Sequence, residues 1–374
     1  MKKYEEISVS EMLKLDESEY LVIDIRDEIA FTYGTINNAV NIPQNRLDEK
    51  LGTLPKDKLL IICCKSGIIS DPVAQNMREK GFNAANLKDD SDRVKDIERS
   101  INKKFHKGIW SKFTSAINDY QLVEEGDKIA VCISGGKDSM LMAKLFQELK
   151  LHNKFDFQVK FLVMDPGYSP ENREIIEKNA KLLNIPITVF ESNIFESVLH
   201  IEKSPCYLCA RMRRGHLYSF AKEMGCNKIA LGHHYDDVIE TILMGMLYGA
   251  QVQTMMPKLH STNFEGMELI RPMYLIREAD IIHWKDYNKL QFIQCACRFT
   301  EGCASCGGTG KGSKRAEIKQ LIRDLTKVSP YIEKNIFRSV ENVNLDTVIA
   351  YKQHGEKHSF LDTYENNKQA AGDE

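Results

Sequence analysis

The sequence lacks a long hydrophobic run and has almost no net charge. No stretch of about 18 consecutive apolar residues occurs, which excludes a membrane-spanning helix of ordinary length. The first six residues, Met-Lys-Lys-Tyr-Glu-Glu, place acids where a secretion signal needs an apolar stretch, so we expect a cytoplasmic protein with no membrane partner. The 51 Lys and Arg residues and the 53 Asp and Glu residues leave a net charge of −2. Only local basic patches can therefore argue for a nucleic acid partner.

The composition is also unlike that of a disordered protein, which has a low content of apolar residues. Hydrophobic residues make up 43% of the sequence and charged residues 28%, as in ordinary soluble globular proteins. Its 374 residues are too many for one average core, so we expect at least two domains. We predict a first domain over residues 1–98, a basic linker helix over 99–126, a larger domain over 127–345 and a polar tail over 346–374.

Cysteine, in contrast, is abundant, with ten residues. Proteins of the cytosol rarely keep disulfides, so metal binding or thiol chemistry is the expected use of these side chains. Cys132 and Cys226 lie in apolar surroundings and are expected to be buried as small hydrophobic residues. The other cysteines are candidates for chemistry: Cys63, Cys64, Cys206, Cys209, Cys295, Cys297, Cys303 and Cys306.

In the first domain, one cysteine follows a predicted strand. Short apolar runs over 20–26 and 59–63 predict buried parallel strands. Cys64 comes next, followed by a glycine-containing loop and a helical pattern over 71–81. Because loop amides and a helix N-terminus stabilise anionic sulfur, Cys64 is a candidate nucleophile.

This segment resembles a rhodanese domain over roughly residues 4–98. The matching residues are Asp24 to Asp27, Gly34 to Pro43 and the loop opened by Cys64. The resemblance implies that Cys64 carries a persulfide. Many rhodanese loops have an arginine where this chain has Ile69, so we expect Cys64 to receive sulfur from a partner such as a cysteine desulfurase rather than from thiosulfate. The alternative is an inactive rhodanese fold that serves only for docking.

The linker has an amphipathic pattern. Phe105, Ile109 and Phe113 recur at helical spacing, which predicts a helix over 99–122. Its lysines, Lys103, Lys104, Lys107 and Lys112, occupy other positions. They belong either to a solvated helix or to a surface that contacts nucleic acid phosphates.

A glycine-rich loop, Ser134-Gly-Gly-Lys-Asp-Ser139, lies between a predicted buried strand over 128–133 and a helical pattern over 140–149. Such a loop directs backbone amides and the helix dipole at phosphate. It is not a Walker loop, because Asp138 follows Lys137. It resembles the pyrophosphate loop of N-type ATP pyrophosphatases, which implies cleavage of ATP between its α and β phosphates and adenylation of an acceptor oxygen.

Three further apolar runs, over 159–164, 187–190 and 228–231, predict the strands of a doubly wound parallel α/β sheet. Ligands of such sheets bind beyond the carboxyl ends of the strands. We expect Lys137 and Asp138 to act in catalysis, and Asp138, Asp236 and Asp237 to be candidate Mg²⁺ ligands. Helix capping is the alternative role for the last two. The predicted ATP contacts are Ser134, Gly135, Gly136, Lys137, Asp138, Ser139, Asp165, Gly232, His233, Asp236 and Asp237.

Cys206 and Cys209 begin another helical pattern and share one helical face. Together with the glycine-rich loop, the Gly232–Asp237 segment and Arg271-Pro272, they resemble the tRNA 2-thiocytidine synthetase family over roughly residues 100–328. That family holds a [4Fe–4S] cluster with three cysteines. The implied ligands here are Cys206, Cys209 and Cys297, with Cys295 as the second choice for the third position.

The sequence departs from this family at Cys303 and Cys306, which lie among glycines and resemble half of a zinc knuckle. With Cys295 and Cys297, or with the two cysteines near residue 206, they would complete a four-thiolate Zn²⁺ site. Such a site competes with the cluster hypothesis.

The resemblance implies ATP-dependent thiolation of a tRNA base, chiefly of cytidine to 2-thiocytidine. ATP would activate the C2 carbonyl, the cluster would provide the sulfide, and Cys64 would relay persulfide sulfur from a desulfurase. The family also implies a homodimer. The phosphate contacts of a tRNA with a splayed-out base are expected from Lys103, Lys104, Lys107, Arg211, Arg213, Arg214, Lys314 and Arg315.

Three alternatives remain at this stage. One is a zinc-dependent enzyme that thiolates another base, such as uridine. Another is an amidating synthetase of the same superfamily, although nothing in the chain resembles a glutaminase. The last is a sulfur-relay or adaptor protein without catalytic activity.

Overall fold

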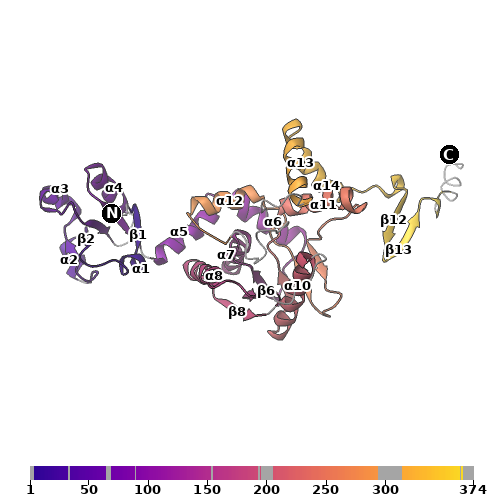
Figure 1. Ribbon diagram of the computed structural model, residues 1–374, viewed down its shortest axis with the longest axis horizontal. Coiled ribbons are helices and arrows are strands. Elements are labelled where there is room, and N and C mark those ends of the chain that lie inside the picture. The colour runs from indigo at the N-terminus through magenta and orange to yellow at the C-terminus, as the bar shows by residue number, and fades with distance from the viewer. Residues whose placement is uncertain are drawn as a thin grey trace.

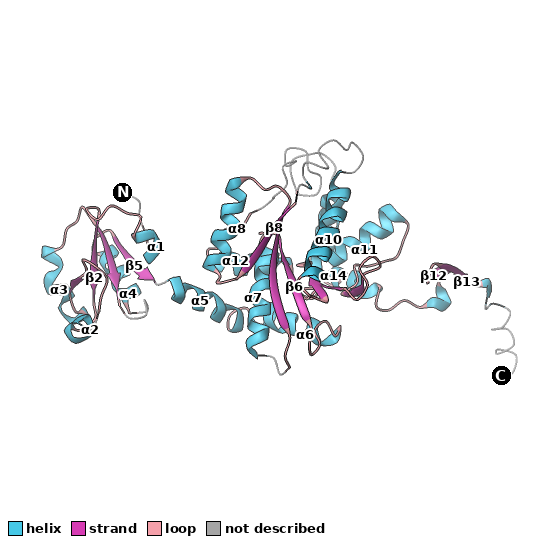
Figure 2. Cartoon of the chain, turned by 90° about the horizontal axis from the view of Figure 1, so that it is seen from below, coloured by secondary structure: helices cyan, strands magenta, loops and turns pink. Residues whose placement is uncertain are grey.

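The computed structural model describes residues 4–32, 34–64, 69–88, 90–152, 155–192, 194, 205–293, 314–362 and 364. Figures 1 and 2 show a smaller domain at one end of the chain, helix α5 (Asp90–Asn102) leading into a larger domain, and a hairpin near the C-terminus. Within the described ranges, no helix is long and apolar enough to span a bilayer.

The smaller domain is a parallel sheet with short helices. Its strands lie in the order β1-β5-β4-β2-β3, and each neighbouring pair is parallel. Side chains of β4 alternate between two apolar clusters, with Leu60 and Ile62 in one and Ile61 and Cys63 in the other, because both faces of the sheet are covered. The strands are β1 (Glu6–Ser8), β2 (Tyr20–Asp24), β3 (Val40–Asn41), β4 (Leu59–Cys63) and β5 (Ala84–Lys88), and the helices are α1 (Val9–Met12), α2 (Glu28–Thr32), α3 (Leu47–Lys50) and α4 (Ser70–Glu79), with 3₁₀ turns at Gln44–Arg46 and Leu51–Thr53.

The segment predicted as one linker helix consists of three helical pieces. They are α5, a π-helical turn (His106–Trp110) and α6 (Ser111–Asp119). Phe105, Ile109 and Phe113 are buried in the main core of the larger domain. Polar contacts also fasten α5 to that domain, since Glu98 lies 2.6 Å from the buried Lys144 amine. The linker is therefore built into the larger domain.

The larger domain has a sheet of order β10-β11-β9-β6-β7-β8, in which every neighbouring pair is parallel except β10 and β11. From β6 the chain passes outward through β7 and β8, and then returns to β9 on the other side of β6. The strand order therefore reverses at β6, where doubly wound sheets bind ligands. The strands are β6 (Lys128–Ile133), β7 (Gln158–Asp165), β8 (Ile187–Glu191), β9 (Lys228–Ala230), β10 (Lys258–His260) and β11 (Glu268–Ile270). The predicted fold class is confirmed.

Helices cover both faces of this sheet. Val131 and Ile133 of β6 pack into the cluster that contains α7 and α12, whereas Cys132 packs with Tyr218 of α10 in a second cluster. Cys132 and Cys226 are both buried, as the sequence predicts, and burial raises the pKa of Cys132 to about 12. The helices are α7 (Lys137–His152), α8 (Pro170–Leu182), α10 (Pro205–Glu223), α11 (Tyr235–Gly249), α12 (Glu278–Tyr287), α13 (Lys314–Val328) and α14 (Ile332–Ser339).

At the boundary of the predicted polar tail, a 3₁₀ turn (Leu345–Thr347) precedes a hairpin of β12 (Ala350–Gln353) and β13 (Glu356–Ser359). His354 and Gly355 form its two-residue turn, both with positive φ, at 51° and 90°. Such angles suit the right-handed twist of the paired strands.

Candidate active site

The glycine-rich loop Ser134–Ser139, called here the glycine loop, joins the end of β6 to the start of α7. The Ser139 hydroxyl accepts a hydrogen bond from the Ser134 amide and donates one to the Gly136 carbonyl, each at 3.1 Å. Gly135 has a φ of 84°, and a Cβ atom there would lie 2.5 Å from Ile176 Cγ1. This position therefore requires glycine. The loop is held so that its amides are grouped at the N-terminus of α7, as phosphate binding needs.

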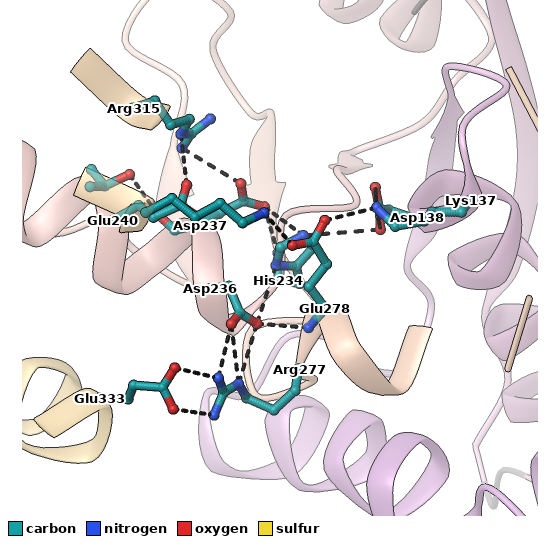
Figure 3. Close-up of polar contacts among 12 residues, drawn as sticks. Lys137, Asp138, His234, Asp236, Asp237, Glu240, Arg277, Glu278, Arg315 and Glu333 are labelled. Atoms are coloured by element: carbon teal, nitrogen blue, oxygen red, sulfur yellow. Dashed lines mark hydrogen bonds and ion pairs between the residues drawn. The ribbon is translucent and has the colours of Figure 1, made fainter. Parts of the chain in front are cut away.

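The Lys137 side chain points from this loop to a carboxylate of another helix (Figure 3). Its Nζ lies 3.2 Å from Glu278 Oε1 and 3.2 Å from Asp138 Oδ1. Glu278 Oε2 in turn lies 2.5 Å from Lys319 Nζ. Burial alone would raise the pKa of Glu278, but Lys319 and Lys137 outweigh it and lower that pKa to about 2. Glu278 is therefore an ionised carboxylate shared by two ammonium groups.

Asp138 has a carboxylate oxygen with spare capacity. Its Oδ1 is buried and accepts no hydrogen bond from the described residues, although Lys137 Nζ lies 3.2 Å away and His234 Nε2 4.0 Å away. Among the described side chains, no three acids, histidines or cysteines converge as a metal site. Mg²⁺ often binds through one or two carboxylates plus substrate phosphates. Asp138 fits such a partial site.

Asp236 and Asp237 occupy the first turn of α11 and make structural contacts. Asp236 accepts a hydrogen bond from the Glu278 amide at 2.7 Å and pairs with Arg277 at 3.0 Å. Asp237 accepts from the His234 amide at 3.1 Å, which caps α11. The capping role that the sequence left open is thus present for Asp237.

His233 and Gly232 lie just before this helix. Burial and the nearby Arg271 guanidinium lower the pKa of His233 to about 4, so its imidazole is neutral at pH 7. A Cβ atom on Gly232 would come within 3.3 Å of the Ser139 amide nitrogen. The segment after β9 therefore lies directly against the glycine loop.

Asp165 ends β7, the strand next to β6. One carboxylate oxygen accepts hydrogen bonds from the amides of Gly167 at 2.9 Å and Tyr168 at 2.7 Å, and the other pairs with Arg173 at 2.7 Å. These contacts shape the turn after β7 at the same edge of the sheet as the glycine loop. Tyr168 is buried, and its hydroxyl lies 3.5 Å from Arg213 of α10.

Cys206 and Cys209 both fall in the first turns of α10, so their predicted helical spacing is present. Cys209 is half-buried and packs against the large apolar cluster. The Cys206 side chain, and Cys295, Cys297, Cys303 and Cys306 entirely, lie outside the described residues. Thiolates at this spacing suit an iron–sulfur cluster or zinc.

In the smaller domain, Cys64 follows the end of β4. Its Sγ lies 3.2 Å from the Ser70 hydroxyl, and that buried hydroxyl lies 2.7 Å from Asn86 Oδ1. The adjacent Cys63 is buried in the sheet, and burial and Asp24 raise its pKa to about 12. Of the two neighbouring thiols, Cys64 is the one placed for chemistry.

Comparisons with known proteins match both domains. A profile described as a PP-loop domain matches residues 105–297, and one described as a rhodanese-like domain matches residues 8–97. The tRNA-cytidine(32) 2-sulfurtransferase of Alcanivorax borkumensis is 36% identical over 258 residues, covering 68% of this chain and 87% of the relative. The chain belongs to this sulfurtransferase family. The family identified from the cysteine and glycine motifs is thereby confirmed.

Other proteins are similar over a comparable share of the chain. The tRNA-cytidine(32) 2-sulfurtransferase of Neisseria meningitidis serogroup A is 35% identical over 248 residues, covering 65% of this chain and 74% of the relative. A U34-tRNA thiolase of Methanococcus maripaludis, solved with its [4Fe–4S] cluster, is 19% identical with a TM-score of 0.49, covering 75% of this chain and 90% of that one.

The basic residues predicted to contact RNA lie in three parts of this sulfurtransferase family member. Lys103 and Lys104 border a cavity of about 850 Å³ between the two domains, and Lys107 is exposed nearby. Arg211 and Arg214 are exposed on α10, where Arg213 is half-buried, and Lys314 is exposed on α13. Arg315 turns toward acids instead, 2.9 Å from Glu240 and 3.5 Å from Asp237.

Several residues of the site did not stand out in the sequence. Glu278, Lys319, Arg277 and Glu333 join the charged network only through the fold, with Arg277 pairing to Glu333 at 2.7 Å. In sequence, Glu278 is an ordinary acid at the start of a helix. The only feature that marks Glu278 in the sequence is its position in the first turn of a helix. Acids are common there because they interact favourably with the helix dipole, whether or not a ligand binds.

Proposed function

We propose that this chain is an ATP-dependent tRNA sulfurtransferase that converts a cytidine to 2-thiocytidine. Its relatives are tRNA-cytidine(32) 2-sulfurtransferases, and we propose position 32 for the modified cytidine here as well. The observation that supports this most directly is the glycine loop, closed by Ser139 beside Lys137 and Asp138, in a member of that family. We expect the reaction to take place in the cytoplasm.

The first step is adenylation. The cytidine C2 oxygen attacks the α-phosphorus of ATP, and pyrophosphate leaves. The amides of the glycine loop and Lys137 would bind the leaving pyrophosphate and offset its developing charge. The buried Oδ1 of Asp138, with no hydrogen bond from a described residue, fits one ligand of a Mg²⁺ ion that also binds phosphate oxygens. Ser134, Asp165, Gly232 and His233 would shape the surrounding pocket.

The second step replaces oxygen with sulfur. A sulfur nucleophile attacks C2, and AMP leaves with the former C2 oxygen. Cys206, Cys209 and Cys297 would hold a [4Fe–4S] cluster, which when bound supplies an iron for the incoming sulfide. Cys209 packs against the apolar cluster that contains Ile133 and Met140, the residues on either side of the glycine loop, which supports an iron–sulfur cluster on that side of the sheet. Zinc at Cys303 and Cys306 is the competing proposal for the metal.

Sulfur would reach this site through Cys64. A cysteine desulfurase persulfide would transfer its outer sulfur to the Cys64 thiolate, leaving the donor thiolate behind. A dithiol reductant would then release this sulfur from Cys64 as sulfide, which regenerates the Cys64 thiolate and converts the dithiol to a disulfide. The half-buried position of Cys64, beside the Ser70 hydroxyl, supports this role. We further propose that the protein acts as a homodimer and that tRNA phosphates contact exposed basic residues of the linker, α10 and the start of α13, namely Lys103, Lys104, Lys107, Arg211, Arg214 and Lys314.

Two substitutions separate the steps. Lys137→Gln should abolish pyrophosphate release with tRNA while leaving labelled sulfur transfer from a desulfurase to the protein intact. Cys64→Ser should abolish labelled sulfur transfer from the desulfurase to the protein while leaving pyrophosphate release intact. Lys327→Gln is the matched control, because this lysine of α13 is 74% exposed and pairs only with Asp324 among the contacts described.

Nucleoside mass spectrometry of tRNA from a deletion strain tests the product. We expect 2-thiocytidine to disappear and to return with the wild-type gene. Retention of 2-thiocytidine in that strain would overturn the proposed base. Anaerobic purification with iron, sulfide and zinc analysis tests the metal, and stoichiometric zinc without iron would overturn the cluster.

A further inference from the structure

Helix α13 brings two further cations, Arg315 and Lys319, to the acids beside the glycine loop. It lies beyond the matched PP-loop range of 105–297. Arg315 and Lys319 are four residues apart and therefore lie on one face of the helix. Arg315 pairs with Asp237 and Glu240 (Figure 3). The Lys319 amine lies 2.5 Å from Glu278 Oε2. This face of α13 is thus directed at the nucleotide end of the sheet.

Glu278 is fixed between two lysines. Its backbone amide donates to Asp236, its Oε1 lies 3.2 Å from Lys137, and its Oε2 holds Lys319. One carboxylate therefore fastens an amine from the glycine loop and an amine from α13 side by side. Lys137 also lies 3.2 Å from Asp138, so the two amines face two carboxylates. When Asp138 binds Mg²⁺ as proposed, the ion takes up the charge of that carboxylate, and the two lysines that share Glu278 leave a positive charge beside the loop amides. A polyphosphate is the ligand that such a surplus favours.

We propose that Lys319 is a second phosphate-binding lysine, kept beside Lys137 by Glu278 until ATP binds. The amine would then exchange its contact with Glu278 for an oxygen of the β or γ phosphate. This inference depends on the proposed function in one respect, namely that ATP is the ligand of the site. It gives α13 a direct part in binding the leaving pyrophosphate, and it makes Glu278 a positioning residue for both lysines.

Calorimetric titration of the full chain with Mg²⁺-ATP, inorganic pyrophosphate and AMP tests this role. Lys319→Gln removes one charge-assisted contact, so binding of ATP and pyrophosphate should weaken about tenfold. Binding of AMP should not change, because AMP lacks the phosphates that Lys319 contacts. Lys319→Arg keeps the charge and should restore most of the lost affinity.

Lys327→Gln, the same substitution on the exposed part of α13, should leave all three affinities unchanged. Thermal melting of each variant reports whether the fold is intact. The inference is overturned if Lys319→Gln binds pyrophosphate as tightly as the wild type, or if it weakens AMP as much as ATP. A wild-type protein that binds no ATP would instead overturn the proposed function.

Discussion

Cys64 and the glycine loop both follow the carboxyl end of a buried central strand, β4 in the smaller domain and β6 in the larger. Their surroundings differ. Next to Cys64, the Ser70 hydroxyl lies 3.2 Å from the Sγ atom, with Asn86 behind it. Next to the glycine loop, Lys137, Glu278 and Lys319 form part of a charged network.

The difference follows from what each edge is proposed to bind. A polarisable sulfur atom carries at most one negative charge, which loop amides and a hydroxyl can stabilise. A triphosphate brings several charges, so its site needs cations that are already held in place without the ligand. Glu278 and the acids of α11 hold these cations in place. Substitutions at one sheet edge should therefore leave the activity of the other unchanged, and each activity should be lost through a different kind of substitution.

Gly135→Ala should cause the largest loss of ATP affinity. The added Cβ meets Ile176 at 2.5 Å, at a φ of 84° that non-glycine residues rarely adopt. The loop must shift, at a cost of about 3 kcal/mol in strain and overpacking, so ATP affinity should fall about 100-fold. Calorimetric ATP titration measures this, and labelled sulfur uptake at Cys64 should not change.

Gly126→Ala is the control for Gly135→Ala. Gly126 has nearly the same φ, 83°, but an added Cβ would meet nothing within 4 Å. This variant should lose stability through backbone strain and still bind ATP. Equal losses of ATP affinity in both variants would show that contact with Ile176 is irrelevant.

Ser70→Ala should have a smaller effect, confined to the other edge. It removes the hydroxyl next to Cys64 Sγ, and a hydrogen bond to a charged sulfur is worth about 1.5 kcal/mol. Alkylation of Cys64 by iodoacetamide at pH 7 should slow about tenfold. The rate is followed by peptide mass spectrometry, and ATP affinity is measured in parallel.

Ser70→Thr keeps the hydroxyl and should retain most of the alkylation rate. Ser18→Ala, at an exposed serine that contacts Asp16, should leave the rate unchanged. A normal rate in Ser70→Ala would mean that the loop amides alone activate the thiol.

Local sequence patterns predicted the central strands of both sheets and the positions of Cys64 and the glycine loop directly after two of them. Cys64 and the glycine loop are contiguous with apolar runs of β4 and β6, so a short window of sequence contains the whole signal. The burial of Cys132 and Cys226 followed from their apolar neighbours in the same way.

The charged network could not be predicted from such windows. Glu278 meets Lys137 across 141 positions and Lys319 across 41, and neither pairing has a periodic pattern. The linker was predicted as one continuous helix because Phe105, Ile109 and Phe113 keep helical spacing. In the structure, a π-helical turn interrupts the segment while these side chains remain buried in one core.

The smallest expected effect is a loss of folding stability at low pH, which should differ between the two domains. Residues 1–98 contain no histidine, whereas His233 lies beside the glycine loop with a pKa lowered to about 4 by burial and Arg271. The folded chain keeps this imidazole neutral, while the unfolded chain binds a proton below about pH 6.5. The stability that His233 contributes is therefore complete above pH 6.5 and is lost as the pH falls toward 4.

At pH 5.5 the larger domain should be about 1 kcal/mol less stable than at pH 7 through this group. Native-state hydrogen exchange of the β6 and β9 amides, with β4 as the internal reference, measures each domain separately. His233→Gln should flatten the pH dependence of β6 and β9, while the exposed His216→Gln should not. If β4 loses as much protection as β6 over this range, or if His233→Gln changes nothing, the acid response does not originate at His233.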